Sequence, residues 1–441
     1  MVEAIRNSLA LPDLRRKILF TILILIAYRA GSHIPVPGVD ASALREFLES
    51  GTQGSSIVVF LNLLSGGALA NFSVMAMGVY PYITASIIMQ LLTPLVPQLQ
   101  ELSKEGEQGR NKINMYTHWL TVPLAILQAY GQVFFIQSSV PGILTDFGFG
   151  INPLTTIAIL ITMTAGTMIA VWMGELITEQ GIGNGVSIII FGGIVAQMPS
   201  QIAGFISRQD WLNLIIFAVI TVLTIAVIAF VQEGQRRIPV QYGKRVRGTR
   251  VYGGQSSHIP MKVNSAGMIP LIFAQSIMIF PSAVAASFQF NENQFIAGVA
   301  TAVVNWFSPS PQSWPYWILY FLLVVGFTYF YTDVIFKQQN LSDNLQRQGG
   351  FIPGIRPGKR TEVFLNSVLQ RITLVGALML GGVAVLPWIV NIIPGVSQSG
   401  AQTQALLITS TGLLIVVGVV LDTMKQLEAQ LMMRNYEGFI N

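Results

Sequence analysis

The sequence predicts an all-α polytopic membrane protein, with ten transmembrane helices in two inverted five-helix halves. Three observations predict it: the composition, the length of the apolar runs and the placement of the basic residues. Hydrophobic residues make up 52% of the 441 residues and charged residues only 10%, whereas soluble domains carry about 25% charged residues. The apolar runs are 17 to 25 residues long, close to the ~20 residues that a helix needs to cross ~30 Å of hydrocarbon.

The composition also excludes several classes of protein. A chain with so little charge is neither a soluble enzyme, a nucleic-acid binder nor a secreted disulfide scaffold. It has no cysteine, and therefore no disulfide, thiolate nucleophile or cysteine metal site. We predict helices for the apolar runs, because a lipid-exposed helix satisfies its own backbone hydrogen bonds. The ten runs are 18–34, 73–96, 115–137, 152–175, 185–206, 211–232, 266–288, 314–336, 368–392 and 404–424.

The first apolar run and the basic residues indicate how the chain is oriented in the membrane. This run follows Arg15, Arg16 and Lys17, as the apolar part of a signal peptide would, but no small-residue cleavage site follows it. We therefore predict an uncleaved first span with a cytoplasmic N-terminus. Ten alternating spans then leave 22 of the 25 basic residues on the cytoplasmic side. Basic residues mark that side in membrane proteins, so both termini are expected there. The outer basic residues are Arg29, Arg45 and Arg208.

An internal repeat relates the second and seventh runs. Residues 78–89 and 267–278 share six of twelve positions, including a glycine and a proline three residues later. The two runs are five spans apart, and an odd number of spans inverts the second copy. Inverted repeats place a path or binding site between the halves. We expect the halves to be 1–206 and 207–441.

Three segments between the runs are unusual. Residues 57–71 are apolar but too short to span, which predicts either a surface helix in the outer interface or a re-entrant segment filling a cavity. The cytoplasmic loop 233–263 alternates basic and apolar residues like a hairpin, and the loop 337–366 presents Arg356 among prolines and glycines. Basic loops can simply touch anionic lipid, at ~1 kcal/mol per charge. We favour docking of a cytosolic partner.

No catalytic or metal-binding pattern is present. The three histidines, His33, His118 and His258, are isolated in the sequence, which argues against an intramembrane protease. The glycine-rich 181–185 is expected to be a tight turn into the fifth span. Neutral polar residues lie within the spans and form either interhelical hydrogen bonds of ~0.6 kcal/mol each or a polar seam that can open. These residues are Thr84, Gln90, Gln128, Thr164, Asn264 and Gln275.

Several motifs in order carry a family resemblance. They are Asn62–Leu69, Pro81–Gln90, Ile177–Gly185, Arg236–Tyr242, Phe351–Gly358 and Leu413–Val417. From about Leu14 to Phe439 the chain resembles the SecY family, the channel subunits of the bacterial general (Sec) protein translocase. The resemblance implies an hourglass channel that passes unfolded preproteins and releases membrane segments sideways through a lateral gate. It implies no catalytic activity and no cofactor.

The resemblance also assigns roles to individual residues. It implies a pore ring of Val79, Ile83, Val186, Ile190, Ile272 and Ile415. Segment 57–71 matches the plug, whose central residues here are Leu61, Asn62, Leu63, Leu64, Ser65, Gly66 and Gly67. The lateral gate would include Thr84, Gln128, Asn264 and Phe280. The partner-docking residues would be Arg236, Arg237, Lys244, Arg245, Arg247, Arg250, Arg356, Lys359 and Arg360.

The resemblance finally implies partners and a location. The expected partners are the small membrane subunits SecE and SecG, the motor ATPase SecA, the ribosome, preprotein signal sequences and anionic lipids. Ribosomal RNA is the only nucleic acid expected in contact. The expected location is the bacterial cell (inner) membrane. The alternative is an ion-coupled secondary transporter for a small solute, but such carriers usually need ionisable residues deep in the membrane. Here the carboxylates Glu175, Glu179, Glu233, Asp333 and Asp422 lie at the ends of the runs.

Overall fold

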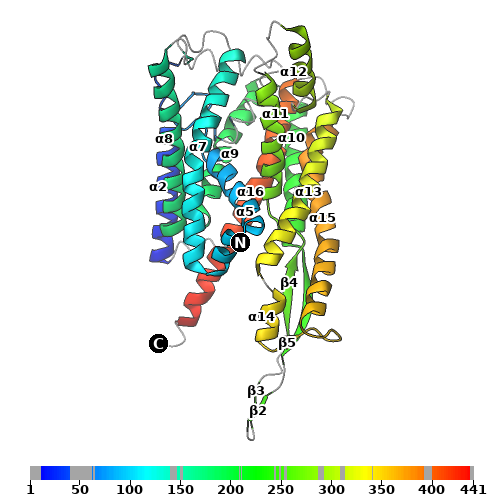
Figure 1. Ribbon diagram of the computed structural model, residues 1–441. Coiled ribbons are helices and arrows are strands. Elements are labelled where there is room, and N and C mark those ends of the chain that lie inside the picture. Colours follow the sequence, from blue (N-terminus) through cyan, green and yellow to red (C-terminus); the bar gives the residue numbers. More distant parts are fainter. Residues whose placement is uncertain are drawn as a thin grey trace. The chain divides into compact units, whose positions relative to one another are not determined.

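The protein is described by a computed structural model and is built mainly of helices, with short strands β1 to β5 (Figure 1). The described residues are 11–39, 62, 65–139, 147–148, 152–207, 209, 211–242, 245–247, 250–252, 256–286, 293–307, 313–339, 341–391 and 400–437. The chain divides into two compact units. The first comprises Met1–Thr221, Ser276–Trp317 and Pro387–Asn441, and the second comprises Val222–Gln275 and Ile318–Leu386. This division is not that of the two inverted halves, which stay a prediction.

Every predicted apolar run overlaps a helix of the structure. Within the described residues, four helices are long and apolar enough to cross a membrane, and a fifth crossing results if α5 and α6 form one bent span. The number of ten spans therefore stays a prediction. The ten helices are α2 (Pro12–Gly31), α5 (Tyr80–Leu95), α7 (Glu107–Ser139), α8 (Pro153–Gln180), α9 (Gly185–Ser207), α10 (Trp211–Glu233), α11 (Ile269–Ala286), α13 (Trp314–Gln339), α15 (Lys359–Asn391) and α16 (Gly400–Glu437).

The start of α5 differs from the prediction. Residues 65–79 form turns, and the helix begins at Tyr80 rather than at residue 73. Gly78 has a φ of 54°, a conformation that glycine adopts without steric cost. At its other end α5 stops before Pro97, and α6 (Pro97–Lys104) turns away by 99°. The proline disfavours a helical conformation in the residue before it.

The cytoplasmic loop predicted at 337–366 contains more structure than the hydropathy indicates. It holds α14 (Leu341–Arg347) and β5 (Gly350–Phe351), and α15 begins at Lys359 rather than at residue 368. The helix α12 (Gln294–Phe307) lies between α11 and α13 in the chain and was not predicted. Hydropathy misses such helices because they are short or begin with polar residues.

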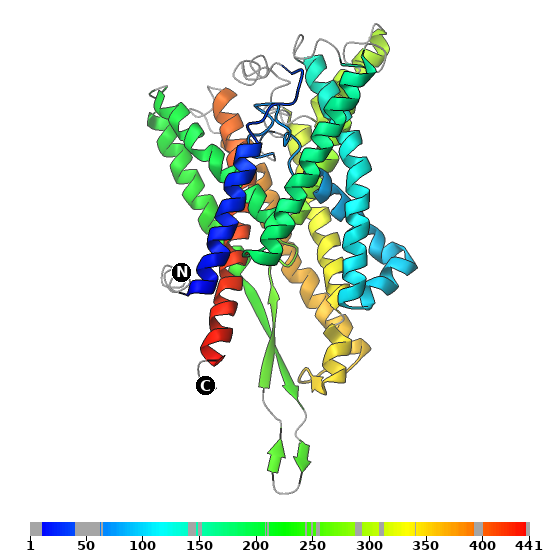
Figure 2. The same cartoon turned by 90° about the vertical axis from the view of Figure 1, so that its left-hand side faces the viewer.

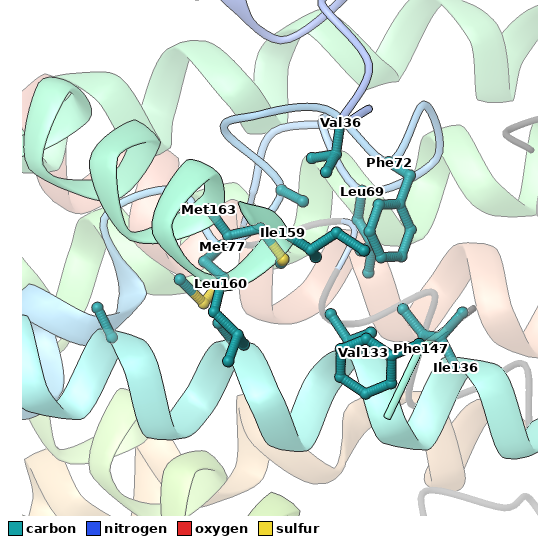
Figure 3. Packing of buried hydrophobic residues seen from close by; sticks show 13 residues of the cluster. Val36, Leu69, Phe72, Met77, Val133, Ile136, Phe147, Ile159, Leu160 and Met163 are labelled. Atoms are coloured by element: carbon teal, nitrogen blue, oxygen red, sulfur yellow. The ribbon is translucent and has the colours of Figure 1, made fainter. Parts of the chain in front are cut away.

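The main core of the first unit lies between α7, α8 and the turns before α5. Figure 3 shows Val133 and Ile136 of α7 together with Leu69 and Phe72 of the turns. Ile159 of α8 completes this part of the cluster. Phe72 and Leu69 are fully buried, so the apolar residues of the turn segment are accounted for by packing against protein rather than lipid. Because the turns at 65–79 pack against α7 and α8, they fix the residue at which α5 begins.

A second cluster in the first unit joins the two ends of the chain's helical part. Leu14 of α2 and Leu427 of α16 are buried together with Ile182 and Met424. Figure 2 shows α2 (blue) beside the end of α16 (red). The turn that carries Ile182, predicted at 181–185, separates α8 from α9. This cluster therefore ties three parts of the first unit together.

The second unit contains the predicted hairpin. Strand β1 (Gln235–Tyr242) pairs antiparallel with β4 (Ser256–Lys262), and β5 pairs with the other edge of β1. The strands β2 (Arg245–Arg247) and β3 (Arg250–Tyr252) form a smaller pair beyond them, as Figure 2 shows. The hairpin expected between 233 and 263 is therefore confirmed.

An apolar core holds the strands of the second unit to its helices. Ile238 and Val240 of β1 are buried with Ile352, which follows β5, and with Leu365 and Leu369 of α15. On β1 the buried residues alternate with exposed ones, as period-two strands require. The extra length of α15 thus serves to support the strands.

Candidate functional site

The described part of the segment predicted at 57–71 consists mainly of buried turns, and its place in the membrane stays a prediction. Residues 65–70 form turns, and Ser65, Ala68 and Leu69 are buried. Leu61, Leu63, Leu64 and residues 57–60 lie outside the described residues.

Asn62 organises the turn of this segment. Its backbone carbonyl accepts a hydrogen bond from the Gly67 N–H at 2.8 Å, and its side-chain Oδ1 accepts one from the Ala70 N–H at 2.8 Å. Gly66 and Gly67 have φ angles of 69° and 87°, which favour glycine at both positions. The Asn-x-x-Ser-Gly-Gly pattern therefore encodes a specific turn.

Two predicted ring residues, Ile190 of α9 and Ile415 of α16, belong to helices that contact each other. A Cβ added to Gly412 would lie 3.0 Å from Ile194, and one added to Gly183 would lie 3.1 Å from Thr423. Gly183 lies in the turn just before α9, so the two contacts together show that α16 runs antiparallel to α9.

This arrangement places two predicted ring residues on the contacting faces of α9 and α16. Ile190 lies one turn from Ile194 on α9, and Ile415 lies one turn from Gly412 on α16, so both are on these faces. Val79, Ile190 and Ile415 are buried, whereas Ile83 and Val186 are half-buried. Ile272 belongs to the second unit and is buried in α11. The ring as a whole stays a prediction.

The predicted gate residue Thr84 belongs to a hydrogen-bonded network. Gln128 Nε2 of α7 donates to Thr84 Oγ1 at 3.3 Å, and Thr84 Oγ1 donates to the Tyr80 carbonyl at 3.1 Å. The Tyr80 hydroxyl lies beside the side chains of Thr84 and of Ser276 in α11. Neutral side chains thus join α5, α7 and α11.

Sequence reasoning missed Tyr80 and Ser276. Tyr80 lies inside the repeated Gly-x-x-Pro stretch. A buried tyrosine hydroxyl usually has a hydrogen-bond partner, so this tyrosine could have been predicted as a polar contact of the gate. Asn264 is in the second unit, where its Nδ2 donates to the Gly267 carbonyl at 3.2 Å. Phe280 is in α11, but its side chain lies outside the described residues.

The predicted docking residues of the second unit are exposed on a supported loop. Strand β5 pairs with β1 through Gln241 and Phe351, which brings the loop carrying Arg356 beside β1. Ile352 is buried beneath this loop, while Arg356 is exposed and its carbonyl accepts a hydrogen bond from Thr361 Oγ1 at 3.0 Å. The loop is therefore rigid at its base and presents its arginine to solvent.

The other docking residues divide into two sets. Arg236, Arg237, Lys359 and Arg360 are exposed, and none of them takes part in an ion pair within the described part of the chain. Lys244 lies outside the described residues. Arg245, Arg247 and Arg250 are on β2 and β3, with side chains outside the described residues.

His118, although isolated in the sequence, has a partner in the structure. Its Nε2 lies 2.6 Å from Glu175 Oε1 of α8, and its ring lies 5.4 Å from that of Tyr82 in α5. The pairing joins helices that are distant in sequence, so no local motif indicates it. No group of three metal-ligating side chains occurs among the described residues.

Known proteins resemble this chain along its full length. The SecY family model matches residues 73–424. The protein translocase subunit SecY of Thermus thermophilus is 44% identical over 446 residues, covering 100% of this chain and 98% of that protein. The chain belongs to the SecY family. Its counterpart from Streptomyces scabiei is 41% identical over 462 residues, with both chains covered completely.

Solved structures agree with the SecY family fold. One, described as a protein conducting channel, has a TM-score of 0.64 at 16% identity and covers 94% of this chain and 92% of its own. Another, of Sec61 in the canine ribosome-channel complex, has a TM-score of 0.61 at 16% identity with the same coverage. At these identities the likeness establishes the fold alone, which is that of the predicted helical channel.

Proposed function

We propose that this chain is the central protein-conducting channel of the Sec translocase. It passes unfolded preproteins across the membrane and releases membrane segments sideways through a lateral gate. The observation that carries the proposal is the full-length identity of 44% with a protein translocase subunit SecY. The alternative, an ion-coupled solute transporter, is not favoured by any comparison.

The pore is closed at rest by branched apolar side chains and by the segment 57–71. Ile190 and Ile415 on the contacting faces of α9 and α16 support this assignment, together with buried Val79. Branched apolar side chains exclude water and ions from a constriction and gate it by dewetting. They also offer a passing polypeptide no hydrogen bond to hold it. Val186, Ile83 and Ile272 complete the proposed ring.

The lateral gate is held by weak neutral hydrogen bonds. The network of Tyr80, Thr84, Gln128 and Ser276 joins α5, α7 and α11, and bonds of this type contribute ~0.6 kcal/mol each in a membrane. A few such bonds keep a gate closed without locking it. A partner or signal sequence that binds the open state better can then shift the population.

The chain works in the bacterial inner membrane, with both termini in the cytoplasm and two inverted halves around the pore. SecE and SecG accompany it, and SecA or the ribosome docks on the basic loops. It has no catalytic activity of its own, so partners supply the energy. The exposed arginines on the strands and on the loop of Arg356 support this docking surface.

The test is preprotein transport into liposomes. Protein purified with SecE and SecG should protect a preprotein from protease only when SecA and ATP are present. Arg356→Glu should abolish this protection while expression and SecE association stay normal. Arg110→Glu, the same charge reversal at an exposed position of α7, is the matched control and should transport normally.

One result would overturn the channel proposal, and another would overturn only its docking surface. Uptake of small solutes without SecA, together with no preprotein protection, would make the protein a carrier. Degradation of the Arg356→Glu variant, or loss of its SecE, would make Arg356 a structural residue and remove the docking argument.

A further inference from the structure

Hydrogen bonds from two helices hold the turn at Asn62–Gly67. Arg29 Nη1 of α2 donates to the Gly66 carbonyl at 2.6 Å, and the neighbouring Tyr28 hydroxyl donates to the Ser65 carbonyl at 3.1 Å. From α9, Gln197 Nε2 donates to the Asn62 carbonyl at 3.1 Å. All three acceptors are backbone carbonyls of one turn. All three donors are side chains of the surrounding helices.

Arg29 is the strongest of the three donors. A hydrogen bond with an ionised donor is shorter and roughly twice as strong as one between neutral groups. Arg29 takes no part in any ion pair within the described residues, so its hydrogen bond to Gly66 does not compete with a carboxylate there. It is also one of the few basic residues that the charge distribution places on the outer side.

The end of α2 fixes the position of Arg29. Its carbonyl accepts hydrogen bonds from Ser32 Oγ at 2.7 Å and from His33 Nδ1 at 2.8 Å. These bonds satisfy a carbonyl that the end of a helix would leave without a partner. The arginine side chain therefore starts from a well-defined backbone.

Close packing against α9 brings the turn within reach of the donors. A Cβ added to Gly193 would lie 2.5 Å from the Gly66 Cα, and one added to Gly66 would lie 2.7 Å from the Gly193 Cα. A Cβ added to Gly67 would lie 3.2 Å from Arg29 Nη1 and 3.5 Å from Gln197 Nε2. Only glycine at these positions lets the backbone approach so closely.

We propose that Tyr28, Arg29 and Gln197 form a latch that sets how readily the segment around Asn62–Asn71 leaves its closed position. The inference rests on the proposed function, since it assigns regulation to the proposed plug. The three are positioning residues, because they act through the segment. Their acceptors are backbone carbonyls, which can exchange these donors for water. The segment can therefore leave as a unit and be recaptured by donors that stay on the helices.

The test measures how often the segment opens. Because the chain has no native cysteine, a single cysteine can be placed at Ala68, which is fully buried. A membrane-impermeant maleimide then labels it only when the segment opens, so the rate follows the open population. The measurement uses the channel complex in liposomes, without SecA or preprotein.

The latch predicts a defined order of labelling rates. Arg29→Met should raise the rate at Ala68→Cys about tenfold, the size expected when a hydrogen bond to a charged group is lost. Arg29→Lys should restore much of the protection, because an ammonium can still donate to the Gly66 carbonyl. Tyr28→Phe, which removes one hydroxyl, should give a smaller increase. The matched control is Tyr116→Phe at an exposed position of α7, which should have no effect.

A second reporter separates a latch from general loosening. Ala125 of α7 is equally buried in the core of the same unit, so Ala125→Cys reports opening of the core. Its labelling should not change in the Arg29→Met variant. Equal increases at both cysteines, or unchanged labelling at Ala68→Cys in both the Arg29→Met and Tyr28→Phe variants, would overturn the latch. Neither result depends on transport, so failure of the channel proposal would appear separately, in the preprotein assay.

Discussion

Gly166 of α8 allows a test of how the turns at 65–79 pack against α8. A Cβ added to Gly166 would collide with the Val74 carbonyl, whose carbon would be only 2.6 Å away. Val74 cannot easily withdraw, because its N–H donates to the Ile34 carbonyl at 2.9 Å. Gly166→Ala must therefore push α8 and the turn apart.

The magnitude follows from two opposing effects. Replacing a glycine in a helix interior by alanine gains about 1 kcal/mol from helix propensity. Overpacking costs ~1–3 kcal/mol and more where backbone must move, so we expect Gly166→Ala to lose ~2 kcal/mol net. Gly131 of α7 has no atom within 4 Å of an added Cβ. Gly131→Ala should therefore gain the full propensity term of ~1 kcal/mol.

The assay is thermal unfolding of both variants in the same detergent at one scan rate, because membrane proteins often unfold irreversibly. A difference of about 3 kcal/mol should separate their midpoints by ~5 °C or more. If Gly166→Ala unfolds at the same temperature as Gly131→Ala, or above it, the described contact between α8 and Val74 is wrong.

Further predictions concern the ring, the gate and the second core. Replacing Ile83 and Ile190 together by glycine should wet the constriction and raise resting ion conductance in a planar bilayer; unchanged conductance would count against the ring. Thr84→Cys with Phe280→Cys should form a disulfide that stops preprotein transport until it is reduced, while a long flexible crosslinker at the same pair permits transport. Normal transport by the fully oxidised protein would place the gate elsewhere. Leu365→Ala, in the core beneath β1, should destabilise the second unit by ~2–5 kcal/mol and increase hydrogen exchange in the strands. Val363→Ala, at an exposed neighbour, should change stability by less than ~0.5 kcal/mol, and a similar effect of both variants would contradict the assigned core.

The helices could be predicted from hydropathy, but their boundaries could not. The turns at 65–79 contain Leu69 and Phe72, which are as apolar as a span and yet pack against protein. Hydropathy does not distinguish these two kinds of burial. The start of α15 was predicted too late for the opposite reason. Its first turns contain many polar residues, although Leu365 and Leu369 in this part of the helix are buried in the core. Amphipathic segments have too low a mean hydropathy to be counted as spans.

The candidate site shows the same limit. The family resemblance implied that Thr84 and Gln128 both belong to the lateral gate, and the structure joins their side chains directly. Ser276 and Glu175 could not be assigned, because their partners lie far away in the sequence. Such pairs depend on helix register, which a single sequence does not specify. The roles of the ring and of Arg356 stay predictions that only measurements on the channel can test.

The cluster of Leu14 with Leu427 has a consequence for the order of synthesis. Leu14 belongs to the first of the described helices along the chain, whereas its partner Leu427 belongs to the last of them. Chains are made from the N-terminus onward, so this buried contact forms only when nearly all of the polypeptide has been synthesised. Until then α2 keeps an apolar end without its partner. A nascent chain that stops before Met424 should therefore be recognised by quality-control proteases as incomplete, even with most of its helices inserted.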